Sequence, residues 1–232
     1  MQRSDRRLII SEINPKSPIS EAYRTLRTNI QFSAIDEDLR VIVITSAGPG
    51  EGKSTTASNL AVVSAQAEKK VLLIDADLRK PTAHRTFLLT NRIGLTNYLT
   101  GQAGVDEVVR SSFVPNLDVL TAGSSPPNPS EMLGSRKMLS LVEHLKQFYD
   151  MIIIDTPPAL VVTDAQIVST YSDGVVLVID SGKVKREAAL KVKSSLEHVK
   201  ARLLGVVLNN IDRKTSENYY YYYYYGNQAD QK

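Results

Sequence analysis

The stretch AGPGEGKS at positions 47–54 has the residue types and the spacing of a loop that binds phosphate groups. Its glycines lack side chains, so backbone N–H groups can turn inward around phosphate oxygens. Lys53 can bridge the β- and γ-phosphates of a nucleotide, and the Ser54 hydroxyl can bind Mg²⁺. A Gly/Pro turn that happens to hold a lysine is the simpler alternative. We expect the phosphates of ATP to contact Gly48, Pro49, Gly50, Glu51, Gly52, Lys53, Ser54 and Thr55.

Aspartates follow two of the apolar runs that predict strands. VLLIDADLRKP at 71–81 contains Asp75 and Asp77, and IIIDTPP at 152–158 contains Asp155. Ligands bind at the carboxyl ends of strands in open parallel sheets. Carboxylates at that edge can hold Mg²⁺, and one of them can take the proton of an attacking hydroxyl. Capping of the following helices is the alternative for any single aspartate.

Two further residues are weaker candidates. Arg79 follows Asp77 closely and can pair with the substrate or with charge in a transition state. Asn209 ends a late strand and can meet the edge of an adenine, although asparagine also ends strands without any ligand. The sequence contains no G-x-G-x-x-G fingerprint and no H-R-D or D-F-G set, which argues against a nicotinamide enzyme and a kinase of the eukaryotic fold.

The elements around these residues alternate between strands and helices. Apolar runs predict strands at 41–46, 71–77, 117–123, 151–157, 175–180 and 203–210, and helical patterns occur at about 20–32, 53–67, 130–148, 163–171 and 186–200. Most of the strand runs are apolar nearly throughout, as strands buried on both faces should be. The sequence therefore predicts an α/β fold of the P-loop NTPase type, with a mostly parallel central sheet and helices on both faces.

Composition excludes several kinds of chemistry. The 232 residues include no cysteine, which rules out disulfides and cysteine metal sites. The 28 basic and 25 acidic residues give a net charge of +3, too balanced to predict a nucleic-acid partner. The longest apolar runs have strand length, so we expect that the chain does not span a membrane by itself.

The motifs taken together resemble those of the bacterial tyrosine kinases, which are P-loop enzymes of capsule and exopolysaccharide production. The resemblance rests on AGPGEGKS, VLLIDADLRKP, IIIDTPP and the closing cluster of tyrosines, and it extends from about Pro18 to the C-terminus. Chromosome-partitioning and septum-site ATPases share the three nucleotide motifs. They usually carry a lysine where this chain has Gly48, which favours the kinases.

The resemblance implies roles for the matching residues. Lys53 would bind the phosphates of ATP, while Mg²⁺ would be held by Ser54, Asp77 and Asp155. Either Asp75 or Asp77 would act as the base for a tyrosine hydroxyl, which would make Lys53, Asp75, Asp77 and Asp155 the catalytic set.

The segment EAYRTLR at 21–27 is similar to the family's E-x-x-R-x-x-R pattern, which is associated with ring assembly. Glu21, Arg24 and Arg27 would lie on one face of a helix and pair with a neighbouring subunit. Internal i,i+3 pairs on a solvated helix are the alternative. The resemblance further implies a separate membrane adaptor that recruits a cytoplasmic kinase to the inner face of the membrane, protein-tyrosine substrates and a cognate phosphatase.

A run of consecutive tyrosines lies close to the C-terminus. In a flexible tail it can enter the active site of a neighbouring subunit, where the local concentration is high. Aggregation and stacking on single-stranded nucleic acid are the alternatives for such a run. The predicted autophosphorylation sites are Tyr219, Tyr220, Tyr221, Tyr222, Tyr223, Tyr224 and Tyr225.

We divide the chain into an N-terminal extension over 1–17, a P-loop kinase domain with an N-terminal oligomerisation helix over 18–212, and a flexible tyrosine-rich tail over 213–232. The predicted activity is an ATP-dependent protein-tyrosine kinase that modifies its own tail in trans and regulates polysaccharide synthesis. A P-loop ATPase that acts as a nucleotide-switched assembly protein is the alternative, and a non-enzymatic scaffold is a third.

Overall fold

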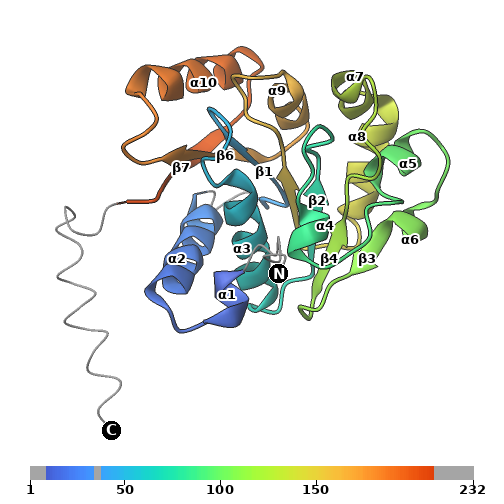
Figure 1. The fold of residues 1–232 in the computed structure, drawn as a ribbon, viewed down its shortest axis with the longest axis horizontal. Coiled ribbons are helices and arrows are strands. Elements are labelled where there is room, and N and C mark those ends of the chain that lie inside the picture. The colour runs from blue at the N-terminus through green and yellow to red at the C-terminus, as the bar shows by residue number, and fades with distance from the viewer. Residues whose placement is uncertain (1–8, 34–37, 212–232) are drawn as a thin grey trace, which may run out of the picture.

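A seven-stranded sheet forms the centre of the molecule (Figure 1). The computed structural model describes residues 9–33 and 38–211. The strand order is β3-β4-β2-β5-β1-β6-β7, and only β3 pairs with its neighbour in the antiparallel direction. The mostly parallel sheet of a P-loop fold is therefore confirmed. The strands are β1 (Val41–Ser46), β2 (Val71–Asp75), β3 (Val109–Ser111), β4 (Leu117–Leu120), β5 (Met151–Asp155), β6 (Gly174–Asp180) and β7 (Leu203–Asn209).

The central strands explain why the sequence shows continuous apolar runs. Every residue of β1, β2, β5 and β6 is buried, because each strand has neighbours on both sides and helices above and below. A strand in that position needs apolar side chains on both faces. The edge strand β7 has partly exposed residues throughout, and its apolar side chains Val206 and Leu208 face solvent.

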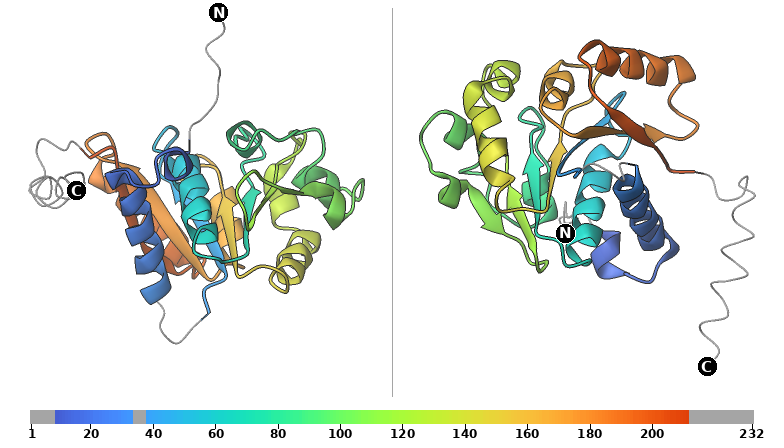
Figure 2. Two further views of the ribbon diagram at one scale, coloured as in Figure 1. Left: turned by 90° about the horizontal axis from the view of Figure 1, so that it is seen from below. Right: turned by 180° about the vertical axis from the view of Figure 1, so that it is seen from behind.

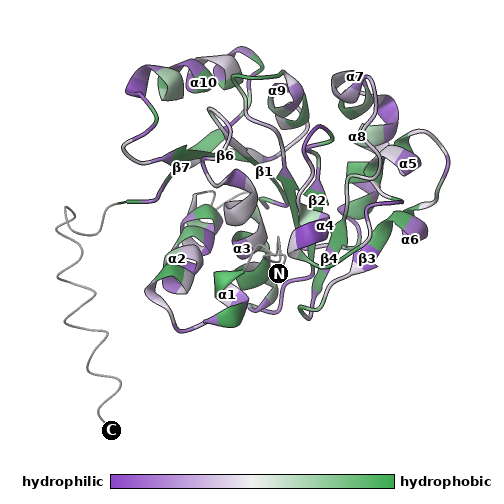
Figure 3. Ribbon diagram, in the orientation of Figure 1, coloured by the Kyte–Doolittle hydropathy of each residue, from purple (hydrophilic) through white to green (hydrophobic). Residues whose placement is uncertain are grey.

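Helices cover both faces of the sheet, as predicted (Figure 2). Figure 3 shows the hydrophobic residues gathered on the strands and on the helix faces that meet them. One face packs against α1 (Ile10–Ile13), α2 (Pro18–Phe32), α3 (Lys53–Ala65) and α4 (Ala83–Thr86). The other packs against α5 (Leu95–Leu99), α6 (Val105–Val108), α7 (Pro129–Leu133), α8 (Arg136–Leu145), α9 (Asp164–Ser169) and α10 (Arg186–His198). No helix in the described part of the chain is both long and apolar enough to cross a bilayer.

The structure differs from the sequence prediction in several respects. The strands predicted over 71–77, 117–123 and 151–157 end earlier, at Asp75, Leu120 and Asp155. The single helix expected over 130–148 is two helices, because the chain breaks at Gly134 and the Ser135 hydroxyl accepts the N–H of Met138 at 3.2 Å to start α8. Strand β3 and the helices α1, α4, α5 and α6 were not predicted. Each has at most five residues, too few to show a periodic pattern.

Part of the segment predicted as an N-terminal extension packs against the domain. Ile9 is buried in the core on the α3 side of the sheet. The Ser11 N–H donates to Asn59 Oδ1 on α3 at 3.0 Å. Helix α2 then begins with Pro18 at its first turn, after Ser17 has accepted the N–H of Ser20. The predicted tail over 213–232 lies outside the described residues.

A close backbone approach makes Gly94 sensitive to substitution. A Cβ atom there would lie 2.2 Å from the Thr121 carbonyl oxygen and 2.4 Å from the Gly123 nitrogen. Since both are backbone atoms, the loop after β4 would have to move. We expect Gly94→Ala to lower the free energy of unfolding by about 2–3 kcal/mol in urea denaturation. Gly104→Ala is the control, because its Cβ would meet nothing nearer than Glu107 Oε2 at 3.6 Å. Equal losses in both variants would contradict this account.

Candidate active site

The loop between β1 and α3 takes a shape that depends on glycine. Gly50 and Gly52 have φ angles of 81° and 94°, in the left-handed region that residues with a Cβ avoid. A Cβ at Gly52 would also lie 2.1 Å from Asn209 Nδ2. Ser46, the last residue of β1, donates its hydroxyl to the Gly48 carbonyl at 2.7 Å. The predicted strand–loop–helix context of AGPGEGKS is therefore present.

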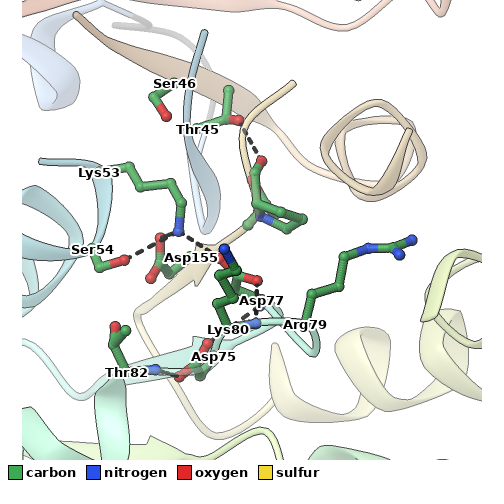
Figure 4. Close-up of polar contacts among 12 residues, drawn as sticks. Thr45, Ser46, Lys53, Ser54, Asp75, Asp77, Arg79, Lys80, Thr82 and Asp155 are labelled. Carbon is green, nitrogen blue, oxygen red and sulfur yellow. Dashed lines mark hydrogen bonds and ion pairs between the residues drawn. The ribbon is translucent and has the colours of Figure 1, made fainter. Parts of the chain in front are cut away.

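Lys53 brings the loop together with two of the predicted aspartates (Figure 4). Its Nζ lies 2.9 Å from Asp77 Oδ2 and 3.3 Å from Asp155 Oδ1, and it donates to Ser54 Oγ at 3.1 Å. Strands β2 and β5 are adjacent and in register, with Asp75 opposite Asp155. Their carboxyl ends therefore deliver the aspartates to the start of α3, at the edge of the sheet where ligands bind in this kind of fold.

The structure separates the surroundings of Asp75 and Asp77. Asp75 is fully buried, and its Oδ2 accepts the N–H groups of Thr82 and Ala83 at 2.8 Å each. This is the capping arrangement that the sequence left open for a strand-end aspartate, here at the start of α4. The Asp77 carboxylate instead contacts Lys53 and accepts one backbone N–H, from Lys80, and the residue is 5% exposed. Asp77 is thus the member of the pair whose charge lies beside the loop lysine.

The electrostatics of the site favour binding of additional positive charge. Burial, together with the charge of Asp155, raises the pKa of Asp75 to about 7. Burial also raises the pKa of Asp155, although Lys53 opposes this effect. Burial alone would lower the pKa of Lys53, but the charges of Asp155 and Asp77 raise it instead. One lysine thus faces three buried carboxyl groups. A further cation would offset the excess of negative charge among them.

The donor atoms around Lys53 suit a hard divalent cation. Ser54, Asp77 and Asp155 offer only oxygen atoms, the ligands that Mg²⁺ prefers. In residues 9–33 and 38–211, no three His, Cys, Asp or Glu side chains are grouped so as to hold a metal by themselves.

Arg79 points away from the aspartate cluster (Figure 4). Its guanidinium lies 3.0 Å and 3.1 Å from the two carboxylate oxygens of Asp164, at the start of α9, and 3.1 Å from Ser130 Oγ. Ser130 donates to the same Asp164 carboxylate at 2.7 Å. The predicted contact of Arg79 with a substrate therefore competes with an internal ion pair. The sequence gives no sign that Asp164 and Ser130 are partners of Arg79, since nothing local links residues so far apart in the chain.

Asn209 also has an internal partner. Its Nδ2 donates to the Glu51 carbonyl oxygen at 3.0 Å, which ties the end of β7 to the phosphate loop. The Asn209 side chain therefore lies beside the phosphate loop. Its predicted contact with adenine stays a prediction.

The three residues predicted for subunit contacts lie along α2 and have partners within the chain. Arg24 lies 2.8 Å from Glu21, an i,i+3 pair on an exposed helix face. Arg27 donates to the Val63 carbonyl near the end of α3 at 2.7 Å. The Glu21–Arg24 contact matches the alternative of an internal i,i+3 pair, whereas Arg27 ties α2 to α3. A role of the three residues between subunits stays a prediction. The tyrosines at 219–225 lie outside the described residues.

Comparison with known proteins identifies the family. A family model described as an AAA domain matches residues 39–206. The tyrosine-protein kinase YwqD of Bacillus subtilis (strain 168) is 53% identical over 209 residues, which cover 90% of this chain and 86% of YwqD. The chain belongs to the bacterial tyrosine kinases. This is the family that the sequence motifs predicted. The chain is therefore a protein-tyrosine kinase.

Solved structures of the bacterial tyrosine kinases share the fold over nearly the whole chain. The kinase domain of the Escherichia coli tyrosine kinase ETK is 35% identical with a TM-score of 0.87, over 93% of this chain and 85% of that domain. The chimerical protein CapA2B2 is 46% identical with a TM-score of 0.85, over 88% of this chain and 89% of the chimera. The fold is thus that of a nucleotide-binding P-loop protein.

Proposed function

We propose that this tyrosine kinase transfers the γ-phosphoryl group of ATP to tyrosines 219–225 in the C-terminal segment of a second copy of the chain. Through this reaction it would regulate the synthesis of capsular or extracellular polysaccharide. The observation that carries the proposal is the Lys53 ammonium group at a glycine-rich loop, within 3.3 Å of Ser54, Asp77 and Asp155. This is the set of groups that phosphoryl transfer requires.

The residues of the site divide the work of neutralising and positioning charge. Magnesium-bound ATP supplies the phosphoryl group, and the metal offsets phosphate charge when it is bound. Ser54, Asp77 and Asp155 would hold the metal, and Lys53 would exchange its carboxylate partners for phosphate oxygens. Backbone N–H groups between Gly48 and Thr55 would surround the phosphates. Phosphoryl transfer has a loose transition state, so positioning and charge neutralisation account for most of the rate.

Asp77 is the better candidate for the residue that orients the tyrosine hydroxyl. A phenol has a pKa near 10, so it would be aimed by a carboxylate and lose its proton as the phosphorus–oxygen bond forms. The proton would pass to the carboxylate while the bond from phosphorus to ADP breaks. Asp77 accepts one backbone N–H, from Lys80. Asp75 is less suited to this role, since it is fully buried and accepts three, from Asp77, Thr82 and Ala83.

The wider setting of the reaction follows from the family. The name of the CapA2B2 chimera joins an A and a B component, which supports a second polypeptide as partner. We propose that this partner is a membrane adaptor that recruits the kinase from the cytoplasm to the inner face of the membrane, and that a phosphatase reverses the modification. Glu21, Arg24 and Arg27 would exchange their internal contacts for contacts to the next subunit of a ring.

The mass of the intact protein after incubation with Mg-ATP tests the proposal. We expect a ladder of added phosphate groups, mapped by peptide analysis to tyrosines 219–225. The trans reaction is tested by mixing two variants: Lys53→Ala with its tail intact, and a chain with Lys53 intact whose seven tail tyrosines are replaced by Phe. Phosphate should then appear on the tail of the Lys53→Ala chain.

Two results would contradict this proposal. Steady release of ADP without any phosphoprotein, with and without the cytoplasmic part of the adaptor, would favour a nucleotide-switched ATPase. Phosphate on the tail of the active wild-type chain but never on the Lys53→Ala chain would show that each subunit modifies only itself.

A further inference from the structure

The Glu51 side chain lies on the opposite side of the phosphate loop from the carboxylates that contact Lys53. Those carboxylates come from the β2 and β5 side of β1, whereas β6 and β7 lie on its other side. Glu51 is 5% exposed, and its Oε1 accepts the N–H of Gly48. Asp180, the last residue of β6, lies close enough to this carboxyl group for its charge and backbone to affect the pKa of Glu51. The side chain is thus hydrogen-bonded to the first turn of the loop and buried beside the end of β6.

A second tether reaches the same residue through its backbone. The Glu51 carbonyl oxygen accepts from Asn209 Nδ2 at the end of β7. The amide group of Asn209 also packs against Gly52, where a Cβ would lie 2.1 Å from Nδ2. On the β6 and β7 side, the loop is therefore held through the side chain and the backbone carbonyl of Glu51. On the β2 and β5 side, Lys53 contacts Asp77 and Asp155.

One of the two carboxyl oxygens of Glu51 accepts no hydrogen bond within the described residues. Within the described residues, Glu51 Oε2 and Asp180 Oδ1 are both buried and have no hydrogen-bond partner. Burial raises the pKa of Glu51, and the nearby charge of Asp180 acts in the same direction. A buried acceptor without a partner is costly, and a donor group at position 51 would relieve it. An amide would therefore be tolerated where a shorter or apolar side chain would not.

We propose that Glu51 is a positioning residue of the phosphate loop: its buried carboxyl group accepts the Gly48 N–H and so holds the loop in its binding shape without touching phosphate. The inference rests on the proposed role of this loop in ATP binding. It predicts that affinity for phosphate-bearing ligands depends on the length and hydrogen-bonding capacity of the side chain, and that the negative charge is dispensable.

Binding of Mg-ADP by calorimetry to the full chain tests this role, with inorganic pyrophosphate as a competitor that lacks adenine and ribose. Glu51→Ala should lower the affinity for both ligands by a similar factor of about tenfold or more. A tenfold loss corresponds to about 1.4 kcal/mol of binding free energy, spent on ordering the loop. Glu51→Gln keeps an oxygen for Gly48 and adds a donor near Asp180. It should therefore bind within about threefold of the wild type. Glu51→Asp, one methylene shorter, should behave like Glu51→Ala.

The binding data can contradict the proposed role of Glu51 in two ways. Unchanged affinity in Glu51→Ala would overturn the inference, and so would a loss in Glu51→Gln as large as that in Glu51→Ala, which would indicate a role for the charge itself. If Glu51→Ala does not fold, judged by its thermal unfolding without nucleotide, the contrast between Glu51→Asp and Glu51→Gln carries the test. Failure of the wild type to bind Mg-ADP would instead overturn the proposed nucleotide site, and the inference with it.

Discussion

Replacement of Lys53 by alanine is expected to lower the rate of phosphate transfer to tyrosine by about a thousandfold or more. Lys53 is the only residue that links the glycine loop to both Asp77 and Asp155 in the described structure. Loss of one preorganised cationic or donor group at a reacting phosphoryl or acyl centre typically costs a factor of about 10² to 10⁵. The measurement is the initial rate of phosphotyrosine formation from Mg-ATP, by quantitative mass spectrometry.

A matched lysine elsewhere provides the control for this prediction. Lys70 precedes β2, at the end of the sheet opposite the site, and its side chain is exposed. Lys70→Ala should retain at least half of the wild-type rate. The proposed role of Lys53 would be wrong if Lys53→Ala, shown to be folded by its circular dichroism, kept more than about a tenth of the wild-type rate.

Replacement of Arg79 by alanine is expected to destabilise the fold more than it disturbs the chemistry. Asp164 is completely buried, and its carboxylate is paired with a guanidinium group whose side chain is 37% exposed. Removing one partner of a buried pair typically costs about 3–5 kcal/mol, and partial exposure reduces that cost. We expect Arg79→Ala to lower the free energy of unfolding by about 2–3 kcal/mol in urea denaturation. Ser130 keeps one hydrogen bond to the carboxylate, so the loss should not be larger.

A double-mutant cycle distinguishes this role of Arg79 from a role in catalysis. Arg79→Ala combined with Asp164→Ala should lose less stability than the sum of the single variants, because the uncompensated charge is gone. Arg92→Ala, at an exposed position, should stay within about 0.5 kcal/mol of the wild type. Below the unfolding transition, Arg79→Ala should keep its phosphotransfer rate within about tenfold. A thousandfold loss in the folded variant would show that Arg79 contacts the reacting groups, as the sequence first suggested.

The sequence by itself determined the fold class and the centre of the site. Strands such as β1 and β5 are buried at every residue, so their apolar runs stand out without any tertiary information. The glycine loop is equally local, because the left-handed angles of Gly50 and Gly52 leave few other residues possible. The position of each aspartate at the end of an apolar run placed the carboxylates at one edge of the sheet.

Only the tertiary structure decided which partner each of these side chains has. The order of the strands sets β2 and β5 beside each other, and this brings Asp77 and Asp155 to Lys53. The sequence could not tell Asp75 from Asp77, because the difference is made by the N–H groups of residues 82 and 83, which turn back over the strand end.

The pairing of Arg79 with Asp164 and the contact of Asn209 with Glu51 join segments that are 85 and 158 residues apart. Such contacts follow from how the helices and strands pack, and packing depends on the whole set of side-chain shapes. A local sequence pattern indicates whether a segment is buried and which backbone angles it adopts, because the residues of one strand or helix have these properties in common. It does not record which distant group will satisfy a polar side chain once the chain has folded.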